Sequence, residues 1–186
     1  MKIAKIVSAL SIVFVITYCL LDRNLFYYGK SDFKYYNLLP LKIIPDYTAK
    51  WEYGFTLRDQ YGFTVAAKGN TYSFNNKTVS ISEVLKYGFS NNQLVAIVSD
   101  SSRVIYCLKF APTPKGRTDF DGVMYSGSKI NDFKLDRWVD IDDNYIGNLS
   151  SYRNRAMLIS LILIITLLYI LIKQIVKKSS RALSKT

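Results

Sequence analysis

The chain contains two long apolar runs, one near each end. The first covers residues 6–21, and the second, residues 156–172, has 12 Leu or Ile among its 17 positions. A helix of 17 residues is about 26 Å long, and flanking lysines can extend its reach to the roughly 30 Å of a bilayer core. A buried helix of a small soluble domain would not be apolar on every face. The pattern therefore predicts transmembrane helices over residues 6–21 and 156–176.

The first run has the length and the positive leader of either a cleaved signal peptide or an uncleaved anchor. Thr17-Tyr18-Cys19 is a poor match to the small-x-small sequence of a signal-peptide cleavage site. The bulky Tyr18 directly before Cys19 also argues against lipoprotein processing, which needs a small residue there. We therefore expect an uncleaved anchor.

Between the two runs, the hydrophobic positions follow a β pattern. β-branched and aromatic stretches predict two hairpins, one from 52–58 and 61–67 and one from 93–98 and 103–110, with further strands at 71–74 and 118–127. The near-continuous hydrophobicity of the second hairpin indicates central strands that are covered on both faces. A Pro- and Gly-containing loop is expected at 111–117. The fold class predicted is a membrane protein in which N- and C-terminal transmembrane helices flank a mainly β (β-rich α+β) extracytoplasmic domain.

The position of the charges changes the picture more than their number. The formal net charge is +11, and seven of the excess positive charges lie in residues 1–21 and 156–186, which contain no acidic residue. A nucleic-acid-binding protein would cluster its basic residues on a folded face, so we expect no nucleic-acid partner. Basic residues that flank apolar runs are instead typical of membrane topology signals, and short basic tails stay on the cytoplasmic side.

This orientation predicts a protein of the bacterial inner membrane with both termini in the cytoplasm. Residues 22–155 would then lie in the periplasm or outside the cell. The expected organisation is a cytoplasmic N-terminus (1–5), the first span (6–21), a juxtamembrane aromatic segment (22–50), a β-rich domain (51–155), the second span (156–176) and a basic cytoplasmic tail (177–186).

Aromatic residues are concentrated after the first span and in a recurring triplet. Six of them, Phe26, Tyr27, Tyr28, Phe33, Tyr35 and Tyr36, fit an interfacial belt and the core of the outer domain equally well. The triplet Tyr-Gly-Phe begins at positions 53, 61 and 87. We expect its glycines to mark bulges or kinks in twisted strands, and not a ligand-stacking platform.

The residue inventory excludes several kinds of chemistry. The chain contains no histidine, so Ser-His-Asp and Cys-His catalysis and imidazole metal sites are excluded. Asp119 and Asp121 are conceivable acid–base partners, but nothing distinguishes them from turn residues. Cys19 and Cys107 are expected to be inert apolar residues and not a disulfide. We expect no catalytic residue and no cofactor.

The clearest polar motif lies in the last part of the outer domain. Asp140, Asp142 and Asn144 match the first side-chain positions of a calcium loop, but Tyr145 stands where the sharp turn requires glycine. We therefore expect no metal site and interpret the motif as a solvated acidic turn. The same region is the candidate surface for a protein partner, made of Asp136, Trp138, Asp140, Asp142 and Asp143.

Topology, size and the missing catalytic groups favour a non-enzymatic binding protein. Its partners would be the lipid bilayer and a protein at the outer face of the membrane, and an immunity or exclusion factor is one concrete form. The alternative is a small accessory or assembly subunit of an envelope or transport complex, which would use its spans as recognition surfaces. We interpret residues 156–172 as lacking a small-xxx-small seam and an intramembrane acid, which weighs against that alternative. A membrane-tethered hydrolase that uses aspartates is the least favoured hypothesis.

Overall fold

The computed structural model describes the chain except for residues 1, 34, 36–37, 49–53, 113–119 and 184–186. The chain divides into two compact units. One unit is helical and consists of residues 1–22 and 147–186, and the other is β-rich and consists of residues 23–146. Two long apolar helices at the ends of the chain therefore flank a β-rich region, as predicted.

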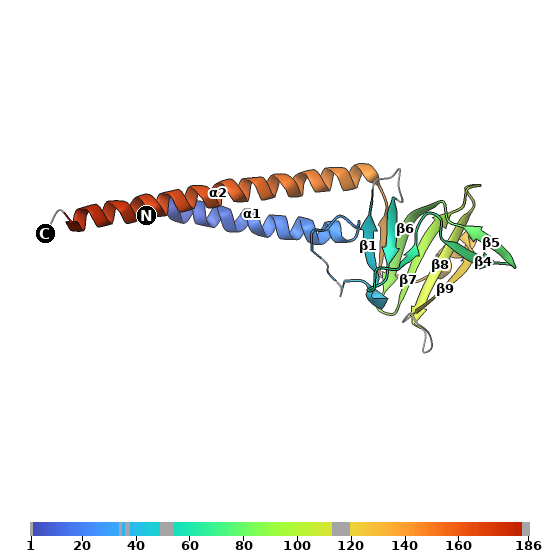
Figure 1. Ribbon diagram of the computed structural model, residues 1–186. Helices are drawn as coiled ribbons and strands as arrows, with labels where there is room; N and C mark the ends of the chain where they lie inside the picture. The colour runs from blue at the N-terminus through green and yellow to red at the C-terminus, as the bar shows by residue number, and fades with distance from the viewer. Residues whose placement is uncertain (1, 34, 36–37, 49–53, 113–119, 184–186) are drawn as a thin grey trace. The chain divides into compact units, whose positions relative to one another are not determined.

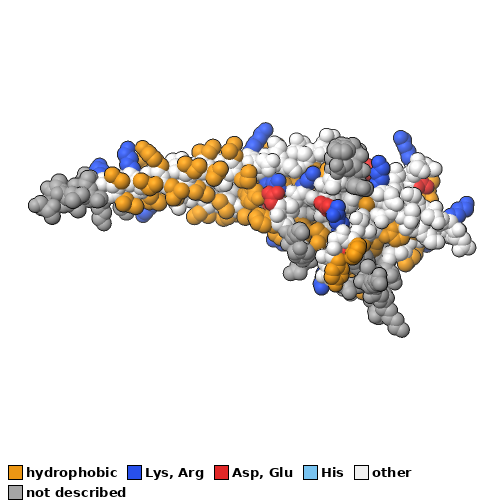
Figure 2. All heavy atoms as spheres, in the orientation of Figure 1, with side chains coloured by type: hydrophobic (Ala, Val, Ile, Leu, Met, Phe, Trp, Pro, Cys, Tyr) orange, Lys and Arg blue, Asp and Glu red, His pale blue; other side chains and the backbone are white. Residues whose placement is uncertain are grey.

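The helical unit contains most of α1 (Lys2–Phe26) and α2 (Asp143–Leu183), which lie side by side (Figure 1). By length and composition, both are long and apolar enough to cross a membrane, among the residues that the structure describes. Hydrophobic side chains cover the outside of this unit (Figure 2), including Val13, Ile16 and Leu168, which are each more than half exposed. The second helix begins well before the apolar run, because the polar residues 143–155 are also helical.

Small residues occupy the buried positions in the apolar part of the two helices. Ser11 of α1 and Ala156 and Ser160 of α2 are each less than a tenth exposed. The two serine hydroxyls donate to the backbone of their own helices, Ser11 Oγ to Val7 O at 2.8 Å and Ser160 Oγ to Met157 O at 2.7 Å. Since Ala156 and Ser160 are four residues apart, the interpretation that this span lacks a small-xxx-small pair is wrong.

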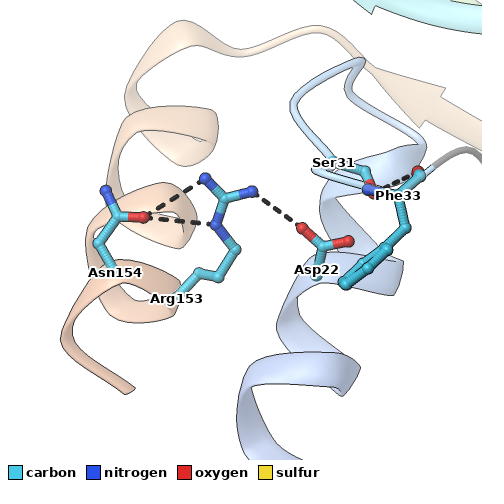
Figure 3. A network of polar contacts seen from close by, with 5 residues as sticks. All are labelled: Asp22, Ser31, Phe33, Arg153 and Asn154. Atoms are coloured by element: carbon cyan, nitrogen blue, oxygen red, sulfur yellow. Dashed lines mark hydrogen bonds and ion pairs between the residues drawn. The ribbon is translucent and has the colours of Figure 1, made fainter. Parts of the chain in front are cut away.

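An ion pair joins the two helices at one end of their apolar stretches. Arg153 Nη1 donates to Asp22 Oδ1 at 2.9 Å, and Asn154 Oδ1 accepts from the other side of the guanidinium (Figure 3). The Asp22 side chain is fully buried and that of Arg153 is 11% exposed. The pair connects residues 131 positions apart in the sequence, so it holds α1 and α2 in one register.

The β-rich unit contains ten strands among the described residues, arranged in three sheets. Their bounds are β1 (Ile44–Tyr47), β2 (Phe55–Arg58), β3 (Thr64–Ala66), β4 (Thr71–Phe74), β5 (Lys77–Ser80), β6 (Glu83–Ser90), β7 (Gln93–Ser99), β8 (Ile105–Pro112), β9 (Phe120–Ser126) and β10 (Arg137–Asp140). The sheet orders are β1-β2-β3, β10-β6-β7-β8-β9 and β4-β5. All pairings are antiparallel. The predicted hairpins β2–β3 and β7–β8 and the returning strand β9 are thereby confirmed.

The largest sheet is covered on both faces, as the hydrophobicity of β7 predicted. Leu94, Ala96 and Val98 belong to the main core. Val95 and Ile97 point to the opposite face and pack in a second cluster. Because successive side chains of a strand alternate between the faces, a central strand must be apolar at every position to fill both clusters.

Most of the aromatic segment after the first span belongs to the core and not to an exposed belt. Phe26 is 2% exposed in the main core, and Tyr27, Tyr28 and Tyr35 pack against that core. Phe33 differs, since it is 51% exposed. Tyr36 lies outside the described residues.

Among the described residues, the Tyr-Gly-Phe triplets do not share one structural role, and neither Gly62 nor Gly88 lies at a strand bulge. The register shifts of the described strands lie at Leu57/Arg58 and Val84/Lys86. Gly62 lies in a loop with φ +89°, and a Cβ at Gly88 would lie 2.7 Å from Trp138. These two glycines are therefore required by a turn and by close packing, respectively.

Two hairpin loops of the β-rich unit have the same architecture. In the β2–β3 loop, Asp59 Oδ1 accepts from Tyr61 N and Phe63 N, and Asp59 N donates to Phe63 O. In the β7–β8 loop, Asp100 Oδ1 accepts from the N–H groups of Ser102 and Val104, and Asp100 N donates to Val104 O. The fourth position of both loops is left-handed, Gly62 at φ +89° and Arg103 at φ +63°. An aspartate that closes the loop on its own backbone explains why each strand turns there.

Candidate functional site

The five residues of the predicted partner surface do not lie on one face. Asp136 and Asp140 are exposed on either side of Trp138, at the edge of the large sheet where β10 pairs with β6. Trp138 is only partly exposed, because it packs on the second hydrophobic cluster, and Lys86 Nζ lies 5.1 Å from its ring centroid. Trp138 therefore anchors β10 on the sheet, which leaves little of it for a partner.

Asp142 begins the second helix. Its Oδ1 accepts from Asn144 N at 2.9 Å and from Tyr145 N at 3.4 Å, and its carbonyl accepts from Ile146 N. This is the arrangement of a helix N-cap, in which a side-chain oxygen satisfies N–H groups of the first turn. The apparent calcium motif is thus split between a strand end, a cap and a helix. No three His, Cys, Asp or Glu side chains of the described residues come together as metal ligands.

Asp143 is bound by a residue from a distant part of the sequence. Tyr47 of β1 donates its hydroxyl to Asp143 Oδ1 at 2.6 Å. Burial, together with this hydrogen bond and the negative charge of Asp143, raises the pKa of Tyr47 to about 12. The tyrosine therefore remains a neutral donor over the physiological pH range.

Asp142 and Asp143 form part of a polar groove of about 630 Å³. We call it the acidic groove, and its lining residues are Tyr47, Gly54, Phe55, Lys68, Ser82, Glu83, Val84, Ile141, Asp142, Asp143 and Asn144. Three carboxylates and one ammonium group line it, so its net charge favours a cationic partner. The volume lies in the usual range of ligand pockets, roughly 300–1,000 Å³.

The acidic groove brings together segments that sequence analysis did not connect. Glu83, at the start of β6, and Lys68, in the turn after β3, line it together with the residues that begin α2. Lys68 is recognisable in the sequence only as a turn residue, and no local signal distinguishes Glu83 or Tyr47. Ser82 lines the groove as well, and the chain contains no histidine that could act as its general base.

Among the other chemical candidates, the two cysteines are not lining residues of this groove. Asp119 is outside the described residues, as is the side chain of Asp121. Cys107 is fully buried in the second cluster, where burial raises the pKa of its thiol, and it is a free cysteine, as is Cys19 of α1. A buried thiol with a raised pKa is a poor nucleophile, as expected for an apolar filler.

Comparison of the chain with protein-family models, with curated proteins and with solved structures finds no match.

Proposed function

We propose that this protein is a two-span protein of the bacterial inner membrane whose β-rich unit binds a protein partner at the outer face, without catalysis. The observation that carries the proposal is the acidic groove, which gathers Glu83, Asp142 and Asp143 around a single lysine. A groove of this charge suits a partner that presents a basic segment. An immunity or exclusion factor, which occupies an incoming toxin or secretion component, is one form of such a protein.

The membrane assignment is supported by the exposed apolar surface of the helical unit. Val13, Ile16, Leu161 and Ile165 are 52–57% exposed, and lipid is the environment in which such side chains on a long helix are stable. Basic residues in the two tails support a topology in which both termini face the cytoplasm. Reporter fusions after Ser128 and after Thr186 test this topology. The reporter fused after Ser128 should indicate a position outside the cytoplasm, and the reporter fused after Thr186 should indicate a cytoplasmic position. An outward C-terminus would refute the topology.

The binding proposal is tested by coexpression with the protein encoded by the adjacent gene. Copurification is expected, and in the immunity form the cell is also protected from the toxicity of that protein. Glu83→Gln with Asp143→Asn should weaken the complex about tenfold or more and reduce its salt dependence, because two charges facing the partner are removed. Asp136→Asn, an exposed aspartate outside the groove, is the matched control and should change little.

A variant of the second span, studied in the same coexpression assay, distinguishes the alternative of an accessory subunit. Replacing residues 161–172 by leucines preserves the buried pair of Ala156 and Ser160 and changes only the remainder of the span. An accessory subunit recognised through its spans should lose activity, whereas a protein that binds through its β-rich unit should keep it.

Equal binding by the groove variant and the unaltered chain would refute the groove as the binding surface.

A further inference from the structure

A second pocket of the β-rich unit contains a buried carboxylate with an unused oxygen. The pocket has a volume of about 280 Å³ and lies between β1, the β2–β3 loop and the segment after α1. We call it the Asp59 pocket, and its lining residues are Phe26, Gly29, Ser31, Phe33, Ile44, Pro45, Asp46, Arg58, Asp59, Gln60 and Gly62. None of these residues belongs to the acidic groove.

Asp59 is only 3% exposed, and one of its oxygens is already used by the loop. Oδ1 accepts from Tyr61 N at 2.9 Å and from Phe63 N at 2.8 Å. Oδ2 is buried, and no group among the described residues donates a hydrogen bond to it. A buried polar atom without a partner costs about 1–3 kcal/mol, and more when it is charged, so it requires an explanation.

The equivalent aspartate of the β7–β8 loop shows that this type of turn does not require an unused carboxylate oxygen. Asp100 closes the β7–β8 loop with its Oδ1 in the same way, but its Oδ2 accepts from Tyr106 Oη at 3.3 Å, and the residue is partly exposed. The loop architecture therefore accounts for Oδ1 of Asp59 but not for the burial of Oδ2. The additional feature of Asp59 is its position in a pocket.

Arg58, which lines the pocket, carries an unused donor. Arg58 Nη2 pairs with Asp46 Oδ2 at 2.9 Å, but its Nε is buried and has no acceptor among the described residues. The two carboxylates and one guanidinium leave one net negative charge in the lining. Phe26, Ile44 and Pro45 supply apolar walls. A complementary ligand is thus small, cationic at one atom, a hydrogen-bond acceptor at another, and apolar elsewhere.

We propose that the Asp59 pocket binds an α-ammonium group together with its adjacent carbonyl oxygen, as presented by the amino terminus of a peptide or by a free amino acid. The ammonium donates to Asp59 Oδ2 and the carbonyl oxygen accepts from Arg58 Nε. A lysine side chain would satisfy Asp59 but leave Arg58 Nε without an acceptor, because it carries donors alone. The net negative charge favours the peptide, which is cationic at its terminus, over the zwitterionic amino acid. The inference does not rest on the acidic groove.

The loop itself explains how this site is held in place. The two N–H groups bound by Asp59 Oδ1 fix the carboxylate, so that Oδ2 has one orientation. Gly29, at φ +70°, lets the segment after α1 approach β1, because a Cβ there would lie 2.4 Å from the backbone of Asp46. Ser31 and Phe33 form a local turn in the pocket wall, in which Phe33 N donates to Ser31 Oγ at 3.0 Å (Figure 3). Such preorganisation reduces the entropy lost when a ligand binds.

The test uses the full chain in detergent micelles and ligand-observed NMR titration of three probes. These are the tripeptide Leu-Ala-Ala amide, its N-acetylated form and free leucine. The free-amino peptide should bind, and acetylation should weaken binding about tenfold or more, as expected for loss of a charged hydrogen bond. Binding of leucine as tight as that of the peptide identifies the free amino acid as the ligand source, and weaker binding identifies the peptide terminus.

Two aspartate variants provide a matched comparison. Asp59→Asn keeps an oxygen for Tyr61 N and Phe63 N but removes the charged acceptor, so peptide affinity should fall about tenfold or more. Asp100→Asn makes the same change in the twin loop and should leave affinity unaltered. Equal binding of the free and acetylated peptides, no binding of any probe, or unchanged affinity in Asp59→Asn would each overturn the proposal. The comparison of free with acetylated peptide holds even if a variant fails to fold.

Discussion

The ion pair between Asp22 and Arg153 should be a large stabilising feature of the helical unit. Asp22→Asn leaves Arg153, whose side chain is 11% exposed, without its carboxylate partner. Breaking a buried pair by removing one partner costs about 3–5 kcal/mol, because the remaining charge stays buried. Since about 1 kcal/mol shifts the melting temperature of a chain of this size by roughly 2–4 °C, we expect Tm to fall by about 6–20 °C.

The assay is thermal unfolding of the full chain in micelles, followed by circular dichroism at the helix band, which reports mainly on α1 and α2. Arg153→Gln should have a similar effect, and the double variant should lose less stability than the two single losses added together, because the partners interact directly.

A surface ion pair provides the control for this prediction. Lys129 Nζ and Asp132 Oδ2 are 3.1 Å apart, but their side chains are 60% and 59% exposed. Asp132→Asn should therefore cost at most about 1 kcal/mol. A loss for Asp22→Asn as small as this, or strict additivity in the double variant, would refute the view that burial makes the Asp22–Arg153 pair strong.

Three further predictions concern single residues elsewhere in the chain. The pKa of the Tyr47 hydroxyl is about 12 in the folded chain and 10.0 in the free side chain, so the folded state binds this proton more tightly. The free energy of unfolding should therefore fall as pH rises from about 10 to 12. In Tyr47→Phe, Tm measured against pH should fall less over that interval, and an unchanged slope would contradict the assignment. Gly88→Ala places a Cβ 2.7 Å from Trp138 and should cost about 1–3 kcal/mol in chemical denaturation, whereas Gly147→Ala, with no atom within 4 Å, should stabilise its helix by about 0.5–1 kcal/mol. Arg103→Gly relieves a left-handed residue at φ +63° and should raise stability by about 1 kcal/mol; a lower Tm would refute strain at that position.

Several elements could be read from the sequence because their signals are local. An apolar run of 17 residues is a helix signal in itself, and the near-continuous hydrophobicity of residues 93–98 indicates a strand covered on both faces. Asp59 and Asp100 are turn-forming residues, because an aspartate side chain can accept hydrogen bonds from the backbone N–H groups that follow it. Both hairpins were therefore predictable. The start of α2 was not, because the polar residues 143–155 resemble a loop in composition and the capping role of Asp142 depends on a helix that follows it.

The candidate sites depended on contacts between distant parts of the chain. In the sequence, Asp142 and Asp143 form an acidic cluster. Their separate roles, as a helix cap and as the acceptor for Tyr47, depend on the positions of β1 and of the start of α2. Nothing local distinguishes Asp59 from Asp100, since both close the same loop, and burial in a pocket separates them.

The sequence by itself determined the two apolar helices, the β-rich region between them and the absence of histidine chemistry. These depend on residue type and short-range periodicity, which local sterics and hydrophobicity convert directly into helices and strands. The tertiary structure alone decided that Asp22 meets Arg153, that five separate segments line the acidic groove and that the second oxygen of Asp59 is buried without a donor. Burial and pairing are properties of the environment of a side chain, and that environment is assembled from residues far away in the sequence.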